Sequence, residues 1–387
     1  MTGGVAVDPE ERLARAGLTG VVAPGSRYWA ERVRDVGPIA AWEGLVSSGR
    51  GRPERPARDL LALERLGGRL LVPGDEEWPL PVDRLATAHY LTKLPGEQLR
   101  EPLALWVRGP LRLDEASLRA AAVVGSRAAT AYGCHVAAEL ASGLAGLGWT
   151  VVSGGAYGID GAAHRGSVAV DGPTVAVLAG GVDVLYPNGN IALLDRVLST
   201  GALVSEVPPG YAAMRGRFLL RNRLIAGLAR GVVLVEAGWR SGALNTVSHA
   251  RALERPVLCV PGPVGSLLSA GCHRELRDTD ARLVTTAEEV VHDLGTIGES
   301  LPERAHGPVG ARDGLRAELA QLLEAVPARS PASTESIARL AAVDVRGALR
   351  ALGALGAAGL VERVDGLWRL TELGRAPAAA AVAPGGR

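Results

Sequence analysis

Three short stretches of the sequence combine glycine, serine and arginine in a way that suits the binding of phosphate groups. They are Gly125-Ser126-Arg127, Ser153-Gly154-Gly155-Ala156-Tyr157-Gly158, and Arg221-Asn222-Arg223. Glycine lets the backbone approach a ligand closely, a serine hydroxyl bonds a phosphate oxygen, and arginine grips it with two parallel hydrogen bonds. The first two stretches also lie between an apolar run and a helical pattern, where backbone N–H groups favour an anion. We therefore expect a phosphate-binding surface.

The stretch that ends at Arg127 leaves two interpretations open when it is taken alone. Gly125 and Ser126 can bring a phosphate close to the backbone, with Arg127 as its counter-charge. A tight strand-to-helix turn with a solvated arginine would have the same sequence, because glycine-rich turns of this kind are common. The motif therefore gains weight only together with the other stretches.

The second stretch adds a ring that is able to stack on a base. Tyr157 lies between Gly155 and Gly158, and Asp160 and His164 follow four residues apart, on one face of a predicted helix. Three interpretations of this acid–histidine pair are open: helix capping with core packing, a metal or acid–base pair, or ordering of the loop. Two ligands without a third nearby do not make a zinc site, so we expect no metal. The Gly-x-Gly-x-x-Gly fingerprint of dinucleotide-binding turns is absent.

The third stretch sets the sign of the charge at this surface. Residues 210–255 contain eight arginines and two acidic residues. Arginine binds phosphates and stacks on bases, and Phe218, the only phenylalanine, lies in the same segment. The alternative is an arginine-rich amphipathic helix with its leucines in the core, which would still leave a basic rim. We expect Arg221 and Arg223 to hold phosphates, and Tyr157 or Phe218 to stack on bases.

A fourth turn, Ser241-Gly242, also follows an apolar run and precedes a helical pattern. No serine in these turns has a clear histidine and aspartate partner in the sequence, so we expect no catalytic residue and no cofactor. Several phosphate-sized cradles beside stacking rings suit an extended polyanion better than a single nucleotide.

The elements that must position these turns alternate regularly. Strand-like apolar runs fall at Ala120–Val124, Thr150–Ser153, Thr174–Leu178, Ala202–Ser205, Gly231–Val235, Val257–Val260 and Leu283–Thr285. Helical patterns lie between most of them, at Tyr132–Leu147, Ile159–Val170, Ile191–Leu198, Phe218–Ala229 and Ala243–Leu253. Near-continuous apolar strands separated by helices predict an α/β fold with a Rossmann-like, doubly wound, mostly parallel sheet. Its ligand crevice is expected at the carboxyl ends of the strands.

The chain is long enough for several domains. We expect a small helical domain at 1–68, of sterile-alpha-motif or helix-hairpin-helix type, and the Rossmann-like domain at 69–294. A Gly/Pro-bearing linker at 295–314 leads to three helices and a β-hairpin, which predict a winged-helix domain at 315–375. The Ala/Pro/Gly-rich tail at 376–387 is expected to be disordered.

Composition excludes little about the partner. The net charge is +1, and almost all basic residues are arginine, which we attribute chiefly to genomic base composition. The three cysteines are widely spaced, as expected for reduced thiols in the cytoplasm. The N-terminal residues lack a signal pattern, and no apolar run approaches the ~18 residues of a membrane-spanning helix, so we expect a cytoplasmic protein without a membrane partner.

Several of these motifs occur in an order that resembles one protein family. Val-Gly-Ser-Arg, Ser-Gly-Gly-Ala-Tyr-Gly-Ile-Asp-Gly-Ala-Ala-His, Phe-x-x-Arg-Asn-Arg-x-Ile-Ala-Gly-Leu, Ser-Gly-Ala-Leu-x-Thr and Val-Pro-Gly follow one another between about Asp75 and Val291. Together they are similar to the bacterial DNA-processing protein A family, also called Smf. None of the motifs would be specific alone.

The resemblance implies a Rossmann-like core between a helical N-terminal domain and a winged-helix C-terminal domain. It also implies single-stranded DNA binding, a homodimer, and the loading of a RecA-type recombinase during natural transformation or homologous recombination, without enzymatic activity. The residues that it places on DNA phosphates are Gly125, Ser126, Arg127, Ser153, Gly154, Gly155, Gly158, Arg221 and Arg223. From the turns themselves we add Asn222, Ser241 and Gly242.

The sequence departs from the family pattern at two places. Members often carry a basic residue after Tyr-Pro, whereas Tyr186-Pro187 is followed here by Asn188-Gly189-Asn190, so a contact there is expected to be weaker or displaced. The usual Ser-Gly-Leu-Ala is Ser153-Gly154-Gly155-Ala156 here, a looser turn that should still bind.

Two other functions compete with single-stranded DNA binding. A nucleotide-processing enzyme of the lysine-decarboxylase-like phosphoribohydrolase type would show Pro-Gly-Gly-x-Gly-Thr followed by a glutamate, and residues 237–246 do not. A duplex-DNA transcription factor would use a winged-helix recognition helix. The candidate, Asp344–Gly356, carries only Arg346 and Arg350 as basic residues, too few for the usual phosphate and base contacts.

Overall fold

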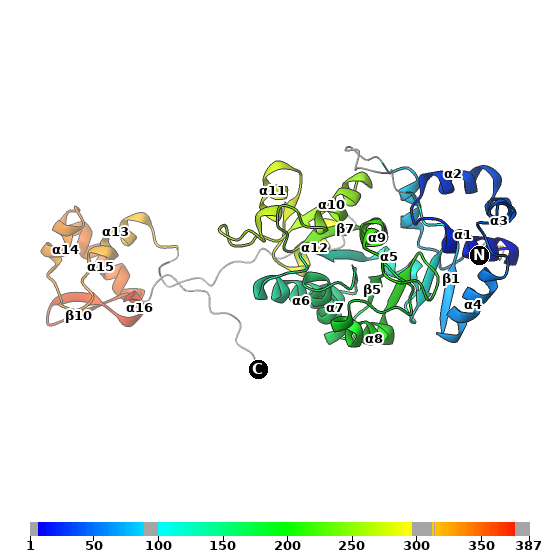
Figure 1. Ribbon diagram of the computed structural model, residues 1–387. Coiled ribbons are helices and arrows are strands. Elements are labelled where there is room, and N and C mark those ends of the chain that lie inside the picture. The colour runs from blue at the N-terminus through cyan, green and yellow to red at the C-terminus, as the bar shows by residue number, and fades with distance from the viewer. Residues whose placement is uncertain (1–6, 89–99, 296–311, 313, 376–387) are drawn as a thin grey trace, which may run out of the picture. The chain divides into compact units, whose positions relative to one another are not determined.

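The computed structural model describes residues 7–88, 100–295, 312 and 314–375, which belong to two compact units. The first unit lies within Met1–Pro302 and the second within Glu303–Arg387 (Figure 1). Among the described residues, no helix is both long and apolar enough to cross a membrane.

A nine-stranded sheet forms the centre of the first unit. The strands are β1 (Gly68–Leu71), β2 (Leu105–Arg108), β3 (Ala120–Val124), β4 (Thr150–Ser153), β5 (Thr174–Val177), β6 (Ala202–Ser205), β7 (Gly231–Leu234), β8 (Val257–Cys259) and β9 (Arg282–Leu283). Their spatial order is β1-β2-β6-β5-β4-β3-β7-β8-β9. The seven strands from β6 to β9 are parallel, and β2 pairs antiparallel with both β1 and β6 at one edge.

Helices cover both faces of this sheet, so its parallel strands are apolar along their whole length. One face packs against α6 (Ala131–Gly146), α7 (Ile159–Ala169), α8 (Ile191–Thr200) and α12 (Ala287–Leu294). The other packs against the 3₁₀ helix η1 (Leu80–Ala86), α5 (Leu113–Leu118), α9 (Arg215–Leu228), α10 (Ala243–Ala252) and α11 (Ala270–Asp278). The predicted doubly wound α/β architecture is confirmed.

The strand order reverses direction once, and this reversal creates the crevice of the fold. From β3 the chain adds β4, β5 and β6 on one side, and α9 then carries it back to β7 on the other side of β3. The turns after β3 and β7 therefore diverge at the carboxyl edge of the sheet. Ligands of doubly wound sheets bind at this switch point.

Four helices precede the sheet: α1 (Pro9–Val21), α2 (Arg27–Val36), α3 (Pro38–Ser47) and α4 (Arg55–Arg65). They bury a small apolar core that includes Leu18, Trp42 and Leu45. Leu63 of α4 joins the core on the sheet beside Leu70. The sterile-alpha-motif or helix-hairpin-helix interpretation stays a prediction.

The second unit consists of α13 (Ala317–Ala325), α14 (Thr334–Leu340), α15 (Val345–Ala357), the antiparallel hairpin β10 (Val361–Val364) and β11 (Leu367–Leu370), and α16 (Glu372–Arg375). These elements share one apolar core. Its assignment as a winged-helix domain stays a prediction. The expected disordered tail at 376–387, and the linker at 295–314 apart from residues 295, 312 and 314, lie outside the described residues.

Helix α12, which follows the last strand of the sheet, begins with a complete capping box that we expect to stabilise the protein. Thr286 accepts a hydrogen bond from the Glu289 backbone, and the Glu289 carboxylate accepts one from the Thr286 N–H. Thr286→Ala should lower the free energy of unfolding by about 1 kcal/mol, because the Glu289 N–H loses the hydroxyl oxygen that accepts its hydrogen bond. Urea denaturation measures the change, and Thr286→Ser, which keeps the hydroxyl, is the matched control. Equal losses in both variants would contradict this role.

Candidate nucleic-acid interface

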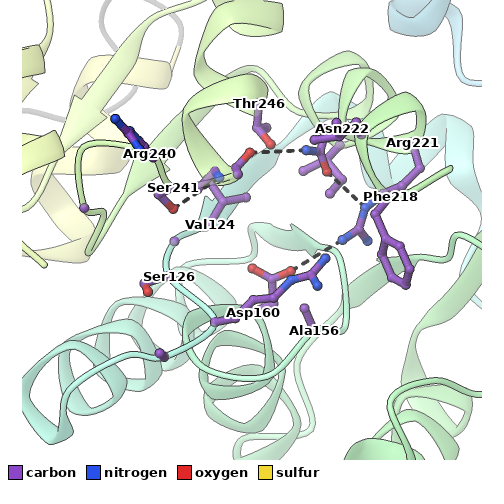
Figure 2. A pocket seen from close by; sticks show the side chains of 18 of the residues that line it. Val124, Ser126, Ala156, Asp160, Phe218, Arg221, Asn222, Arg240, Ser241 and Thr246 are labelled. Atoms are coloured by element: carbon purple, nitrogen blue, oxygen red, sulfur yellow. Dashed lines mark hydrogen bonds and ion pairs between the residues drawn. The ribbon is translucent and has the colours of Figure 1, made fainter. Parts of the chain in front are cut away.

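A pocket of about 520 Å³ opens at the switch point (Figure 2). It is lined by the turn after β3, the turn after β4, the first half of α9 and the turn after β7. Residues from all four predicted stretches line it: Gly125, Ser126, Arg127, Ala156, Arg221, Asn222, Ser241 and Gly242. The turns that the sequence marked separately are therefore brought together at one place.

Arg221 of α9 joins two neighbouring strands beneath this pocket. Its Nη1 donates to the carbonyl oxygens of Gly154, at 2.6 Å, and Val177, at 2.5 Å. Its Nη2 lies 3.8 Å from the Asp160 carboxylate, as Figure 2 shows. Burial lowers the pKa of Arg221 to about 10, so the guanidinium stays charged at neutral pH. Burial raises the pKa of Asp160, and the Arg221 charge acts in the opposite direction.

Asn222 extends the same network to the turn after β7. Its side-chain oxygen accepts from Arg221 Nε at 3.0 Å, and its Nδ2 donates to Asn245 Oδ1 at 3.1 Å and to the Gly242 carbonyl at 3.4 Å. Adjacent residues of α9 thus hold the turns on both sides of the pocket (Figure 2).

Glu236 ties the turn after β3 to the end of β7. Its buried carboxylate accepts from the backbone N–H and the hydroxyl of Thr130, each at 2.8 Å. The Ser126 N–H donates to the Glu236 carbonyl at 2.6 Å. Within the described part of the chain, the N–H groups of Arg127 and Ala128 have no hydrogen-bond acceptor. Both residues line the pocket.

Two glycines of the second stretch are required by close approach. A Cβ at Gly154 would overlap the Arg221 guanidinium nitrogens. Gly158 has φ +75°, and a Cβ there would overlap the Ser126 carbonyl oxygen. Only glycine lets these turns touch one another, because any side chain would force them apart.

Three rings and one arginine, none of them fully buried, form a surface beside the pocket, which we call the aromatic ledge: Arg127, Tyr157, Tyr186 and Phe218. The exposed Arg127 guanidinium lies 4.9 Å from the Phe218 ring centroid, and the Tyr186 ring lies 5.7 Å from that of Phe218. Tyr157, half exposed, accepts a hydrogen bond from the Gly189 N–H. An arginine over a ring leaves charge and π-surface side by side.

The exposed Arg240 supplies positive charge on the other side of the pocket. It lies in the turn after β7, next to Ser241, and makes no ion pair among the described residues. Figure 2 shows it across the pocket from Phe218. The arrangement can neutralise a polyanion and stack planar groups.

Comparisons with known proteins identify the family of this chain. Residues 69–295 match the model of the DNA recombination-mediator protein A family. The chain belongs to this family. A Mycobacterium tuberculosis protein provisionally named DNA processing protein DprA is 48% identical over 97% of this chain and 98% of its own length.

Other family members support the assignment. The DNA processing protein DprA of Streptococcus pneumoniae is 39% identical over 50% of this chain and 67% of its own length. The X-ray structure of DprA from Streptococcus pneumoniae superimposes with a TM-score of 0.61 and 26% identity, covering 75% of this chain and 99% of that chain.

Three side chains that the sequence placed on phosphates are buried and hydrogen-bonded within the protein: Arg221, as described above, Arg223 and Ser153. Arg223 is fully buried: its guanidinium pairs with both oxygens of Glu206 at 2.5 and 2.6 Å, and its Nε donates to the Arg100 carbonyl. Ser153 is also fully buried and donates to the Val123 carbonyl. Both side chains serve the fold, because a fully buried, satisfied donor offers nothing to a ligand.

The Asp160–His164 pair does not form a joint site. The Nδ1 of His164 lies 2.8 Å from the Thr174 hydroxyl, whereas Asp160 faces Arg221. Burial, with the nearby charge of Arg221, lowers the pKa of His164 to about 3, so the ring is neutral at physiological pH. The described residues contain no cluster of three side chains that could hold a metal ion. Of the three interpretations left open, ordering of the loop fits Asp160 and core packing fits His164.

Three residues of this region were not predicted from the sequence: Tyr186, Arg240 and Asn190, which supports the second turn. Asn190 Nδ2 donates to the Gly155 and Ala156 carbonyls, and so holds the second turn from behind. The segment after Tyr186, which departs from the family pattern, therefore shapes the turn without a charge. The only signals in the sequence were the Tyr-Pro dipeptide and the arginine next to Ser241-Gly242.

Arg223→Ala should destabilise the protein by about 3–5 kcal/mol, because it leaves Glu206 buried without its partner. Urea denaturation measures the loss. The double variant Arg223→Met/Glu206→Leu should recover most of the stability, since it removes both charges. A loss below about 1 kcal/mol for Arg223→Ala would show that this ion pair is not a structural element.

Proposed function

We propose that this protein binds single-stranded DNA at the switch-point pocket and acts as a recombination mediator. One observation supports this proposal most strongly: the free backbone donors, Arg127 and Arg240 lie around a single pocket, and the aromatic ledge borders that pocket. Phosphates would lie on the donors and arginines, and bases would stack on Phe218, Tyr186 or Tyr157. A groove with positive charge and stacking rings suits single strands, because a duplex keeps its base faces covered.

The partners follow from family membership and the same chemistry. We infer that the protein works in the cytoplasm as a homodimer and delivers its bound strand to a RecA-type recombinase. It would hold and protect the strand without cleaving it. These proposals rest on the family and on a site built for contacts to a polyanion.

An enzyme of the phosphoribohydrolase type is the weaker alternative. Such an enzyme needs a free acidic group at this crevice. The acidic residue that follows β7 most closely in the sequence is Glu236. Glu236 is 2% exposed, and its carboxylate accepts two hydrogen bonds from Thr130. Asp160 is likewise buried against Arg221. Both acids support turns, which favours binding over catalysis.

Arg127→Ala and Arg240→Ala should each weaken binding of a labelled dT oligonucleotide about ten-fold, because each removes a charged group that would bind phosphate. Fluorescence anisotropy over a salt series measures this. The slope of log K against log salt should become shallower by about 0.7 for each phosphate that the variant no longer neutralises.

The matched control removes two exposed arginines from the second unit, Arg346→Ala/Arg350→Ala, and should leave affinity nearly unchanged. A duplex of the same length should bind more weakly than the single strand. Unchanged affinity in both Arg127→Ala and Arg240→Ala, or a large loss in the control, would overturn the proposed site.

A further inference from the structure

The turn after β7 carries an exposed tryptophan that the site described so far does not use. Trp239 is 58% exposed, whereas the other six tryptophans, all within the described residues, are buried or half-buried. Its neighbours Gly238 and Arg240 both line the switch-point pocket. A large apolar ring is left in water at the edge of a site for an anion.

Helix α11 holds this turn in place. The Gly271 N–H donates to the Ala237 carbonyl at 2.7 Å, and a Cβ at Gly271 would lie 2.6 Å from that oxygen. The Arg274 guanidinium, which also lies 3.3 Å from Glu275, is 5.6 Å from the Trp239 ring centroid. The backbone of the turn is thus fixed, and an arginine from α11 positions the ring.

Arg274 and Trp239 repeat, at the turn after β7, the chemistry of Arg127 and Phe218. Figure 2 shows Arg240, the residue after Trp239, across the pocket from Phe218. Both pairs place a guanidinium within 6 Å of a ring centroid. Arg127, Ala128 and Arg240 line the pocket, and so do Phe218 and Gly238, the residue before Trp239. A phosphate site between two stacking surfaces matches the alternation of backbone and bases in one strand.

We propose that Trp239 is a second base-stacking platform, so that a single strand crosses the pocket with a base on Phe218 at one side and a base on Trp239 at the other. This inference rests on the proposed function and extends its footprint to the β7 turn. The Arg274 guanidinium lies near the indole and adds positive charge near the strand. The exposed part of the ring offers π-surface to a base. Stacking of this kind is tolerant of sequence.

Intrinsic fluorescence tests the contact in the unmodified chain. Saturating dT oligonucleotide should quench a tryptophan signal that is absent from Trp239→Phe, because the stacked base contacts this indole. An oligonucleotide that binds to saturation, measured by anisotropy, without any difference in quenching between the two proteins would overturn the inference.

Affinity gives the second readout. Trp239→Ala should weaken binding of a dT oligonucleotide about five-fold or more, whereas Trp239→Phe should retain most of it, because a phenyl ring still stacks. Tyr28→Ala, which removes a 65% exposed ring from α2, should have no effect.

Failure of the proposed function and failure of the second stacking platform give different results. If the unmodified protein does not bind the oligonucleotide, the proposed function itself fails. If it binds, loses affinity in Arg127→Ala and keeps it in Trp239→Ala, only the second platform is overturned.

Discussion

One buried guanidinium holds the binding edge of this protein together. Taking a charge out of water costs several kcal/mol unless it is paired and hydrogen-bonded, and Arg221 is satisfied by the Gly154 and Val177 carbonyls, by Asn222 and by the nearby Asp160 carboxylate. These partners come from different strands and turns. Because Arg221 lies on α9, the helix that carries the chain across the switch point, the same network fixes where Phe218 stands, one turn earlier on that helix. The pocket and the aromatic ledge therefore share one support.

This arrangement separates the charges that build the site from those left for a ligand. Arg221 and Arg223 both bind groups of the protein itself: Arg221 donates to carbonyl oxygens, and Arg223 pairs with Glu206. Arg127 and Arg240 are exposed and are not bound in this way. Of the three arginines that line the pocket, only Arg127 and Arg240 are exposed. Rings and backbone donors must then supply much of the binding, and those contacts suit a flexible strand whose bases are open.

Much of the fold could be predicted from the sequence, because buried parallel strands are apolar along their whole length and the turns between them are marked by glycine. The convergence of the turns could also be predicted, since the strands that precede them belong to one sheet. Which of the arginines are buried could not be predicted. Arg221, Arg223 and Arg240 look alike in the sequence, and only the packing of α9 against the sheet, with Glu206 opposite, decides which are buried. Tyr186 was missed for the same reason, because its contact with Phe218 joins segments about thirty residues apart.

Hydrogen–deuterium exchange with and without a saturating dT oligonucleotide tests the central claim most directly. If the strand lies on the free donors of the switch-point pocket, exchange should slow in peptides covering residues 125–128 and 238–242, and peptides from α2 and α15 should not change. Protection confined to the second unit, or a saturated complex with both pocket turns unprotected, would contradict a phosphate site at this edge of the sheet.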